Sequence, residues 1–319
     1  MNINNSSIHP VYIISGPTAS GKTSCSIALA KDLIAKGKKA VIVNFDSLLF
    51  YRGLNIGTAK PSLEEQDGIE HFLMDINSPE NPINAAIYCR LATPLIQKLL
   101  DNQITPILVG GSGFYIRALV KGMIQSTTTP PEIVKTVQLL LEESGIEKIR
   151  EELQVHDLES FNKLHPNDHY RNCRALEHFY ATGSMISDKQ KEIPNPYDFS
   201  ENIHPNWNIT HYYLHIEKED HLKLIESRTQ EMLNCGLIQE YKELLKKGLS
   251  GLERPMQSIG YKQVGDFLKG EIKESELAEK ISIATRQLAK AQRTFFKKVT
   301  PTITLHPHEL LKRIQEEDL

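Results

Sequence analysis

The chain has 319 residues, of which 40% are hydrophobic and 24% are charged, and its formal net charge is −3. This length and composition are typical of a globular protein with one large core and room for a smaller second domain. No apolar run reaches the roughly 18 residues that a membrane-spanning helix needs, and the N-terminus lacks the segments of a secretory signal. The mild acidity does not indicate a nucleic-acid partner, so such a partner must be argued from local charge.

The four cysteines are far apart in the sequence and form no CxxC pair (Cys25, Cys89, Cys173, Cys235). This spacing argues against a disulfide framework and against a zinc site. We therefore expect a reducing, cytoplasmic location.

Three short apolar runs in the first third of the chain predict buried strands: Val11–Ile14, Ala40–Phe45 and Pro106–Val109. Between the first two, Lys22–Ala35 has the periodicity of a helix, and Gly37 ends it. Strands separated by helices indicate a parallel α/β sheet, whose ligands bind at the carboxyl ends of the strands. The segments that follow these strands are therefore expected at one edge of the sheet.

The composition and periodicity of the sequence change after Gly122. A charged stretch with helical periodicity, residues 122–200, predicts a helical insertion or lid domain, and residues 1–121 and 201–319 then form the core. A further strand is expected at His211–Ile216, followed by amphipathic helices to about Lys298. The tail from Pro301 is expected to be peripheral.

Residues 16–23 read GPTASGKT and match the phosphate-binding pattern G-x-x-x-x-G-K-[ST] between a predicted strand and a predicted helix. The glycines let several backbone N–H groups point at one anion, to which the helix N-terminus adds positive charge. Lys22 adds an ammonium group, and the Thr23 hydroxyl suits Mg²⁺. The expected phosphate-binding residues are Gly16, Pro17, Thr18, Ala19, Ser20, Gly21, Lys22 and Thr23. Kinases, ATPases and other phosphate-handling enzymes share this loop, so the pattern leaves the ligand open.

Asp46 follows the second predicted strand and should face this loop. Its position alone fits a functional role, as a general base or a magnesium ligand, about as well as it fits a helix cap. A protein kinase is excluded because the chain has no HRD or DFG signature.

Several segments, in order over nearly the whole chain, resemble the tRNA dimethylallyltransferase family in its bacterial form, without a C-terminal zinc finger. They are GPTASGKT (16–23), FDSLLFYRGLNIGTAKPS (45–62), LVGGSGFYIRAL (108–119), HPNDHYRNCRALE (165–177), RTQEMLNCGL (228–237), QSIGYK (257–262) and ATRQLAKAQRTFF (284–296). The resemblance implies a P-loop NTPase-like parallel sheet core flanked by helices. It also implies transfer of a dimethylallyl group from dimethylallyl diphosphate to the N6 amine of the adenine 3′ of the anticodon, in tRNAs that read codons beginning with U.

The resemblance bears on the roles of five residues. Asp46 is the base that takes a proton from the adenine amine, and Lys22 and Arg228 meet the charge of the departing diphosphate with Mg²⁺ at Thr23. Ser112 stands where the family usually has threonine and keeps the hydroxyl. Without the resemblance, Arg228 reads as part of a solvated helix face.

The family's tRNA-contacting segments align with further residues of this chain. They are Asp46, Ser47, Leu48, Leu49 and Ser112, then Tyr170, Arg171, Asn172, Cys173 and Arg174, and then Gln257, Ser258, Ile259, Gly260, Tyr261 and Lys262. No membrane and no protein partner are expected, and the resemblance favours a monomer. Three positions depart from the family: Leu224 and Ala291 stand where arginine is common, and Phe295 stands where tryptophan is usual.

One predicted helix carries local positive charge. From Lys280 to His308 there are six lysines and arginines and no acidic residue, and Arg286, Lys290, Arg293 and Lys297 are spaced to share one helix face. Such a stripe suits a phosphate backbone even in an acidic protein, and we expect Arg286, Lys290 and Arg293 to bind tRNA. The opposite face, with Ile281, Ala284, Leu288 and Phe295, is expected to pack on the core.

Three other functions remain open on the residues alone. An adenylate prenyltransferase would use a free nucleotide as acceptor, a small-molecule kinase would bind ATP at the loop, and an RNA-binding module would catalyse nothing. The basic helix and the long insertion argue against a mononucleotide acceptor, which needs neither.

Overall fold

The structure is a computed structural model that describes residues 8–123 and 129–316. The chain divides into two compact units. The first combines the sequence up to Lys121 with the sequence from Tyr197 onward, and the second is Gly122–Pro196.

Six strands of the first unit, among the described residues, form one parallel sheet in the order β3, β2, β4, β1, β5, β6. Their bounds are β1 (His9–Ser15), β2 (Lys39–Asn44), β3 (His71–Phe72), β4 (Ile104–Gly110), β5 (Trp207–Leu214) and β6 (Ile303–Leu305). Ser15 lies opposite Gly110 in the register, and Asn44 lies opposite Val109. The segments after β1, β2 and β4 therefore leave the sheet at one edge, and the predicted parallel α/β sheet is confirmed.

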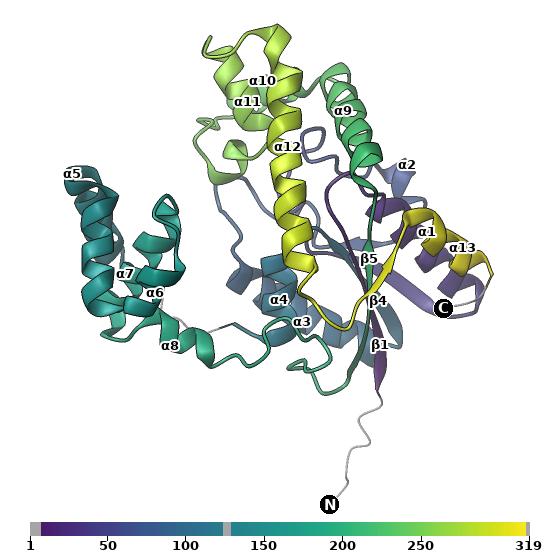
Figure 1. Ribbon diagram of the computed structural model, residues 1–319. Coiled ribbons are helices and arrows are strands. Elements are labelled where there is room, and N and C mark those ends of the chain that lie inside the picture. The colour runs from purple at the N-terminus through teal and green to yellow at the C-terminus, as the bar shows by residue number, and fades with distance from the viewer. Residues whose placement is uncertain (1–7, 124–128, 317–319) are drawn as a thin grey trace, which may run out of the picture. The chain divides into compact units, whose positions relative to one another are not determined.

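Alternate strand residues bury opposite faces of this sheet. Ile14, Ile42 and Ile107 pack under α1 (Lys22–Ala35) and α13 (Pro307–Gln315). Ile13 and Leu108 face the other way, toward α3 (Ala85–Asp101) and α4 (Gly113–Lys121). Figure 1 shows these two helical layers and, beyond the carboxyl edge of the sheet, the long helices α9 (Lys218–Asn234) and α12 (Glu274–Phe296).

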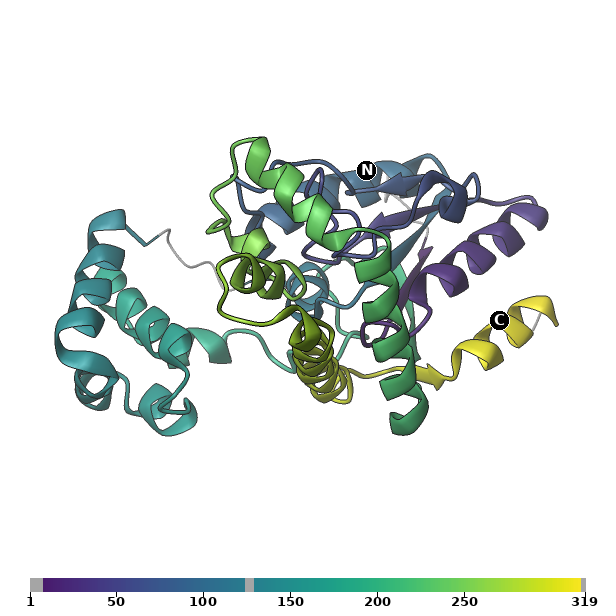
Figure 2. The ribbon, with the colours of Figure 1, turned by 90° about the horizontal axis from the view of Figure 1, so that it is seen from above.

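Shorter helices complete the first unit around that edge. They are α2 (Leu63–Gln66), α10 (Leu237–Lys246), the 3₁₀ turn Arg254–Gln257 and α11 (Tyr261–Leu268). Figure 2 shows that α9 and α12 both stand over this end of the sheet.

The expectation of a peripheral C-terminal tail is wrong. Strand β6 pairs in parallel with β5, and α13 packs against α1 through Leu310, which is fully buried, and Ile314. The sequence from Pro301 carries only one short apolar run, so its part in the sheet depends on long-range pairing that local periodicity does not reveal.

The second unit is entirely helical over its described residues. It comprises α5 (Pro131–His156), which is broken at Gly145, then α6 (Leu158–Lys163), α7 (His169–Thr182) and α8 (Ile186–Lys191). Its own small core contains Val137, Leu153 and Leu176. The start of the segment expected to be inserted includes residues 124–128, which lie outside the described residues.

The second unit ends at Pro196, four residues before the expected boundary. The reason is that the next residues pack on the first unit. Phe199 is buried, and its N–H donates to the carbonyl of Thr300, whose own N–H donates to Tyr197.

Candidate active site

The phosphate loop joins β1 to α1 at the carboxyl edge of the sheet. Two of its residues have a left-handed backbone, Ala19 with φ 59° and Gly21 with φ 76°. The N–H groups of Ala19, Ser20 and Gly21 have no acceptor within the described part of the chain, and the buried Ser20 hydroxyl has no partner there either. These free donors make the loop a concave site for an anion.

Lys22 begins helix α1 and folds back over the loop, where its Nζ donates to the carbonyl of Pro17 at 2.7 Å. Burial lowers its pKa to about 8; the nearby Arg228 lowers it as well, and Asp46 opposes the shift. A bound anion would favour the charged form of the lysine.

Helix α12 holds the loop through one side chain. Gln292 accepts a hydrogen bond from the N–H of Thr18 at 2.8 Å and donates to the carbonyl of Gly111 at 3.0 Å. A Cβ on Gly111 would lie 2.3 Å from the Gln292 amide nitrogen, so a larger residue here would displace the Gln292 side chain. Gln292 therefore joins the loop after β1 to the turn after β4.

Asp46 follows β2 and is half-buried. Its N–H donates to the Asn44 side chain at 2.7 Å, and its Oδ1 accepts the N–H of Leu48 at 3.1 Å. This is a local turn and not a helix cap, so the capping alternative for Asp46 is wrong. The other carboxylate oxygen remains available to accept a proton.

Ser112 lies on the turn after β4 and contacts Ser47, the residue that follows Asp46. Its hydroxyl oxygen accepts the N–H of Ser47 at 3.0 Å, which leaves the hydroxyl hydrogen free to donate. Asp46 and Ser112 are therefore brought together by the pairing of β2 with β4.

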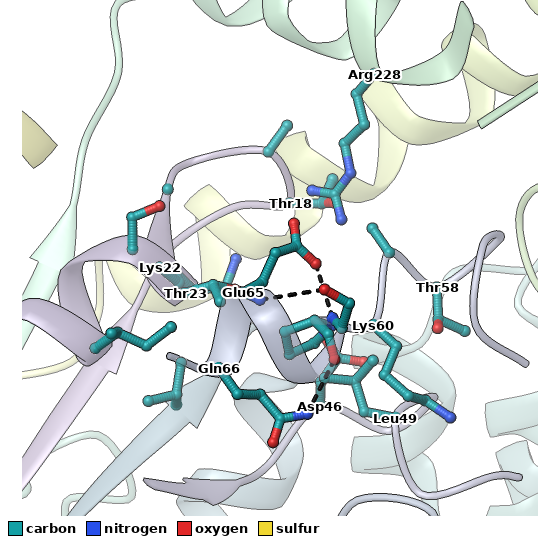
Figure 3. Close-up of a pocket in the computed structure, with 18 of the residues that line it drawn as sticks. Thr18, Lys22, Thr23, Asp46, Leu49, Thr58, Lys60, Glu65, Gln66 and Arg228 are labelled. Atoms are coloured by element: carbon teal, nitrogen blue, oxygen red, sulfur yellow. Dashed lines mark hydrogen bonds between the residues drawn. The ribbon is translucent and has the colours of Figure 1, made fainter. Parts of the chain in front are cut away.

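The phosphate loop opens into a cavity of about 1270 Å³. Figure 3 shows Arg228 reaching into it from α9, with Thr18, Lys22 and Thr23 on the loop side. Arg228 is half-buried, and burial lowers its pKa while Asp46 opposes that shift. Asp46, Lys22 and Arg228 thus share one electrostatic environment, and Arg228 is not on a solvated helix face.

A second cavity, of about 580 Å³, lies next to the first. The two share one wall, which consists of Thr18, Ala19, Asp46, Thr58, Arg228 and Met232. The catalytic residues expected from sequence divide between them: Lys22 lines the first cavity, Ser112 lines the second, and Asp46 and Arg228 line both.

Most of the expected tRNA-contacting residues in the first unit line the second cavity. These are Asp46, Ser47, Leu48, Ser112, Gln257, Ser258, Ile259 and Gly260. Leu49 lines the first cavity instead. Tyr261 is fully buried, and its hydroxyl donates to Glu240 at 2.5 Å, so its side chain supports the site from behind. Lys262 is exposed and pairs with Asp266.

The expected tRNA-contacting segment of the second unit lies on α7, where only part of it reaches solvent. Tyr170 and Arg171 are exposed and Arg174 is half-buried. Asn172, at 0% exposure, binds Arg150 within the unit, and Cys173 belongs to its core. The side chains of these two residues are buried within the unit, and their expected contact with tRNA stays a prediction. Asp168 caps α7, and its side chain accepts the N–H of Arg171.

The expected core-facing side of α12 is only partly buried. Ile281 packs in the core, but Leu288 is 40% exposed and lines the second cavity with Phe295. On the other side, Lys290 is exposed and Arg286 is half-buried. Arg293 differs from both, because its guanidinium donates to the His221 ring at 2.7 Å.

Three positions that depart from the family pattern lie at the cavities. Leu224 is 44% exposed and lines the first cavity, and Ala291 lines the second. Phe295 packs edge-on against Tyr197, and a Cβ on Gly113 would lie 2.3 Å from the Phe295 ring. The phenylalanine therefore fits closely against the turn after β4.

Sequence reasoning missed Gln292, His221, Thr58 and Met232, all of which line or hold the site. Thr58, Met232 and Gln292 lie within the segments that resemble the family, but no role followed from those segments, and His221 lies outside all of them. Gln292 lies 274 residues from its partner Thr18, and only the fold brings them together.

Within residues 8–123 and 129–316, no group of three or more histidine, cysteine, aspartate or glutamate side chains is placed to hold a metal ion. No helix of the same residues is long and apolar enough to cross a membrane.

A P-loop-like α/β core with a carboxylate between two cavities defines an enzyme that binds a phosphorylated ligand beside a second substrate. The family model described as IPP transferase matches residues 49–299. The chain belongs to the IPP transferase family.

Relatives of known name support this assignment. The tRNA dimethylallyltransferase of Crocosphaera subtropica is 38% identical over 90% of this chain and 88% of its own length. Two solved structures are similar over 97% of this chain. The tRNA delta(2)-isopentenylpyrophosphate transferase of Staphylococcus epidermidis is 31% identical, with a TM-score of 0.67 over 97% of its chain. The tRNA isopentenylpyrophosphate transferase of Bacillus halodurans is 28% identical, with a TM-score of 0.68 over 95% of its chain.

Proposed function

We propose that this chain transfers a dimethylallyl group from dimethylallyl diphosphate to the N6 amine of the adenine 3′ of the anticodon. The acceptors are tRNAs that read codons beginning with U, and the location is the cytoplasm. The observation that carries the proposal is the position of Asp46 in the wall shared by two cavities, one of which contains the phosphate loop. A donor diphosphate and an acceptor base can each occupy one cavity and meet at this carboxylate.

In the reaction, a bond forms between the adenine N6 and the allylic C1 of the donor, and the bond between C1 and the diphosphate oxygen breaks. One N6 proton passes to Asp46, and diphosphate leaves with the bonding electron pair. An exocyclic adenine amine is a poor nucleophile, so a carboxylate within hydrogen-bond reach assists the attack. The Ser112 hydroxyl, which accepts the N–H of Ser47, can donate its hydrogen to the adenine ring.

The departing diphosphate is stabilised by donors that are already in place. The free N–H groups of the loop, the Lys22 ammonium and the Arg228 guanidinium all lie around the first cavity. Because they are fixed before the charge develops, they stabilise the transition state without reorganisation.

Magnesium fits this site when the donor supplies most of its ligands. Mg²⁺ prefers oxygen ligands and usually binds through substrate phosphates and waters, so a closed protein cage is not required. The Thr23 hydroxyl lines the loop cavity and has no hydrogen-bond partner among the described residues. We propose that Thr23 holds the ion, which, when bound, neutralises charge on the diphosphate.

An anticodon-loop adenine must leave its stack to reach Asp46, at a cost of a few kcal/mol. We propose that it enters the second cavity, with Arg286 and Lys290 on α12, and Tyr170, Arg171 and Arg174 on the insertion, contacting the RNA backbone. The exposed or half-exposed position of these five side chains supports this assignment.

A direct assay tests the proposal. The protein is incubated with labelled dimethylallyl diphosphate, Mg²⁺ and unmodified tRNA, and we expect label in the RNA at the adenine beside the anticodon. Label in free AMP would instead indicate an adenylate prenyltransferase, and consumption of ATP would indicate a kinase. Binding of tRNA without transfer of label would indicate a non-catalytic module. Each of these three results would overturn the proposal.

A further inference from the structure

His221 lies in the first turn of α9 and is almost completely buried. Its Nε2 is 2.8 Å from the carbonyl oxygen of Thr18 in the phosphate loop, and its Nδ1 is 2.7 Å from the Arg293 guanidinium of α12. A carbonyl only accepts hydrogen bonds and a guanidinium only donates them. The ring is therefore neutral, with its hydrogen on Nε2, and it links Arg293 to the loop.

The bond to Thr18 fixes the direction of the next N–H group. The peptide between Thr18 and Ala19 is trans, so its N–H points opposite to its carbonyl. Because the carbonyl is held toward α9, the N–H of Ala19 points away from α9. This N–H is one of the free donors of the phosphate loop, and Ala19 lines both cavities.

Ala19 also needs external support, because its φ of 59° is unfavourable for a residue with a Cβ. Such a backbone persists when the surroundings hold it in place. The backbone N–H and carbonyl of the preceding residue are both hydrogen-bonded. The N–H of Thr18 donates to Gln292, and its carbonyl accepts from His221. Helices α9 and α12 thus fix the strained turn of the loop from two sides.

We propose that His221 and Arg293 are positioning residues for the donor diphosphate, which they affect by fixing the Thr18–Ala19 peptide of the phosphate loop. This inference rests on the proposed function for the identity of the donor. It reassigns Arg293 from the tRNA-binding stripe, because its guanidinium is engaged beneath the loop while Lys290 on the same helix is exposed.

The test measures two affinities on the full chain: that for inorganic pyrophosphate with Mg²⁺, by calorimetry, and that for tRNA. We expect His221→Leu to weaken pyrophosphate binding about tenfold, the effect of losing roughly one well-formed hydrogen bond. Its tRNA affinity should stay at the wild-type value. His221→Gln should restore pyrophosphate binding to within about threefold, because an amide both donates and accepts as the neutral ring does.

Arg293→Leu is the companion variant, and it supplies the same comparison if His221→Leu does not fold. It should weaken pyrophosphate binding and raise the KM for dimethylallyl diphosphate, with little change in tRNA affinity. Lys290→Leu, on the same helix, is the matched control. It should weaken tRNA binding and leave pyrophosphate binding unchanged.

Wild-type pyrophosphate affinity in both leucine variants would overturn the inference, as would an Arg293→Leu variant that loses only tRNA affinity. Equal losses in His221→Leu and His221→Gln would also overturn it, because the hydrogen bonds would then not be responsible. Failure of the wild-type protein to bind pyrophosphate is a different result, which would contradict the proposed function itself.

Discussion

At the scale of single residues, the chemistry depends on which donors and acceptors are not already used in hydrogen bonds within the protein. Asp46 uses one carboxylate oxygen for the N–H of Leu48, and Ser112 uses its oxygen for the N–H of Ser47. Asp46 keeps one carboxylate oxygen free at the wall between the cavities, and Ser112 keeps its hydroxyl hydrogen free in the second cavity. The local turns thus hold both side chains in place without consuming the groups that the reaction needs.

Asp46→Asn should separate catalysis from binding. The amide oxygen can still accept the N–H of Leu48, but the residue can no longer take a proton. We expect the single-turnover rate to fall by about 10²- to 10⁴-fold, the usual contribution of a general base. Rapid-quench measurement gives this rate, and the tRNA affinity should remain near the wild-type value. A rate close to wild type would show that Asp46 is not the base.

The residue scale also shows what the sequence can and cannot predict. The phosphate loop is local, and its eight residues appear in order with a strand before and a helix after. Arg228 is different, because the orientation of its side chain depends on how α9 crosses the edge of the sheet. Its role was predicted only from the resemblance to the family. His221 lies outside every segment that resembles the family, and Gln292 lies inside one (284–296) without a role assigned to it. The sequence also does not predict the burial of Asn172, because an asparagine near two arginines is typical of an exposed position. Its partner Arg150 is brought next to it only by the fold.

At the scale of elements, α12 combines two functions on different sides. Gln292 and Phe295 line the second cavity, whereas Lys290 faces solvent. The helical periodicity predicted a basic and an apolar face, but Arg293 of the basic face bonds His221, and the apolar face borders a cavity. Leu288 remains 40% exposed because it lines that space and has no core residue to cover it.

Lys290→Glu tests the exposed side of this helix. Replacing a cation with an anion should weaken tRNA binding and make its dependence on salt concentration shallower, since fewer counterions are released. Pyrophosphate binding should not change. Filter binding over a series of salt concentrations measures both effects. Lys98→Glu, an exposed substitution at the end of α3, is the control, and an equal effect there would indicate a nonspecific response to net charge.

Helix α13 should contribute substantially to stability, in contrast to the expectation from sequence. Leu310→Ala removes a fully buried side chain between α13 and α1, and we expect the free energy of unfolding to fall by about 2–5 kcal/mol. Urea denaturation measures this change. Lys312→Ala, an exposed neighbour, should stay within about 0.5 kcal/mol of wild type. Similar small effects for both variants would mean that α13 is peripheral after all.

At the scale of the whole molecule, one buried histidine of β5 connects the end of β1 to the residues that precede β6. His211 in β5 accepts the Ser15 hydroxyl at 2.6 Å and donates to Thr302, whose own hydrogen goes to Val299. Burial lowers the pKa of His211 from 6.5 to about 3. The ring is therefore neutral in the folded protein under conditions in which the unfolded chain would protonate it.

This difference predicts the sign of a pH dependence. Between pH 6.5 and about pH 3 the unfolded state binds one more proton at His211, so stability falls as the pH is lowered through this window. The contribution is about 1.4 kcal/mol per pH unit. Urea denaturation measures the free energy of unfolding at about pH 7.5 and at about pH 5.5. Its decrease between the two pH values should be smaller by about 1.4 kcal/mol in His211→Asn than in the wild type, because the variant lacks the titrating ring. An equal decrease in the variant and in the wild type would contradict the lowered pKa of His211.

The shared wall between the two cavities also has a kinetic consequence. Because the donor and the acceptor base are proposed to occupy separate spaces that meet only at this wall, neither needs to bind first. Diphosphate product, confined to the loop cavity, would then compete with the prenyl donor while leaving the RNA cavity accessible. Initial-rate inhibition by diphosphate is expected to be competitive toward the donor and noncompetitive toward tRNA, the pattern of a random-order mechanism.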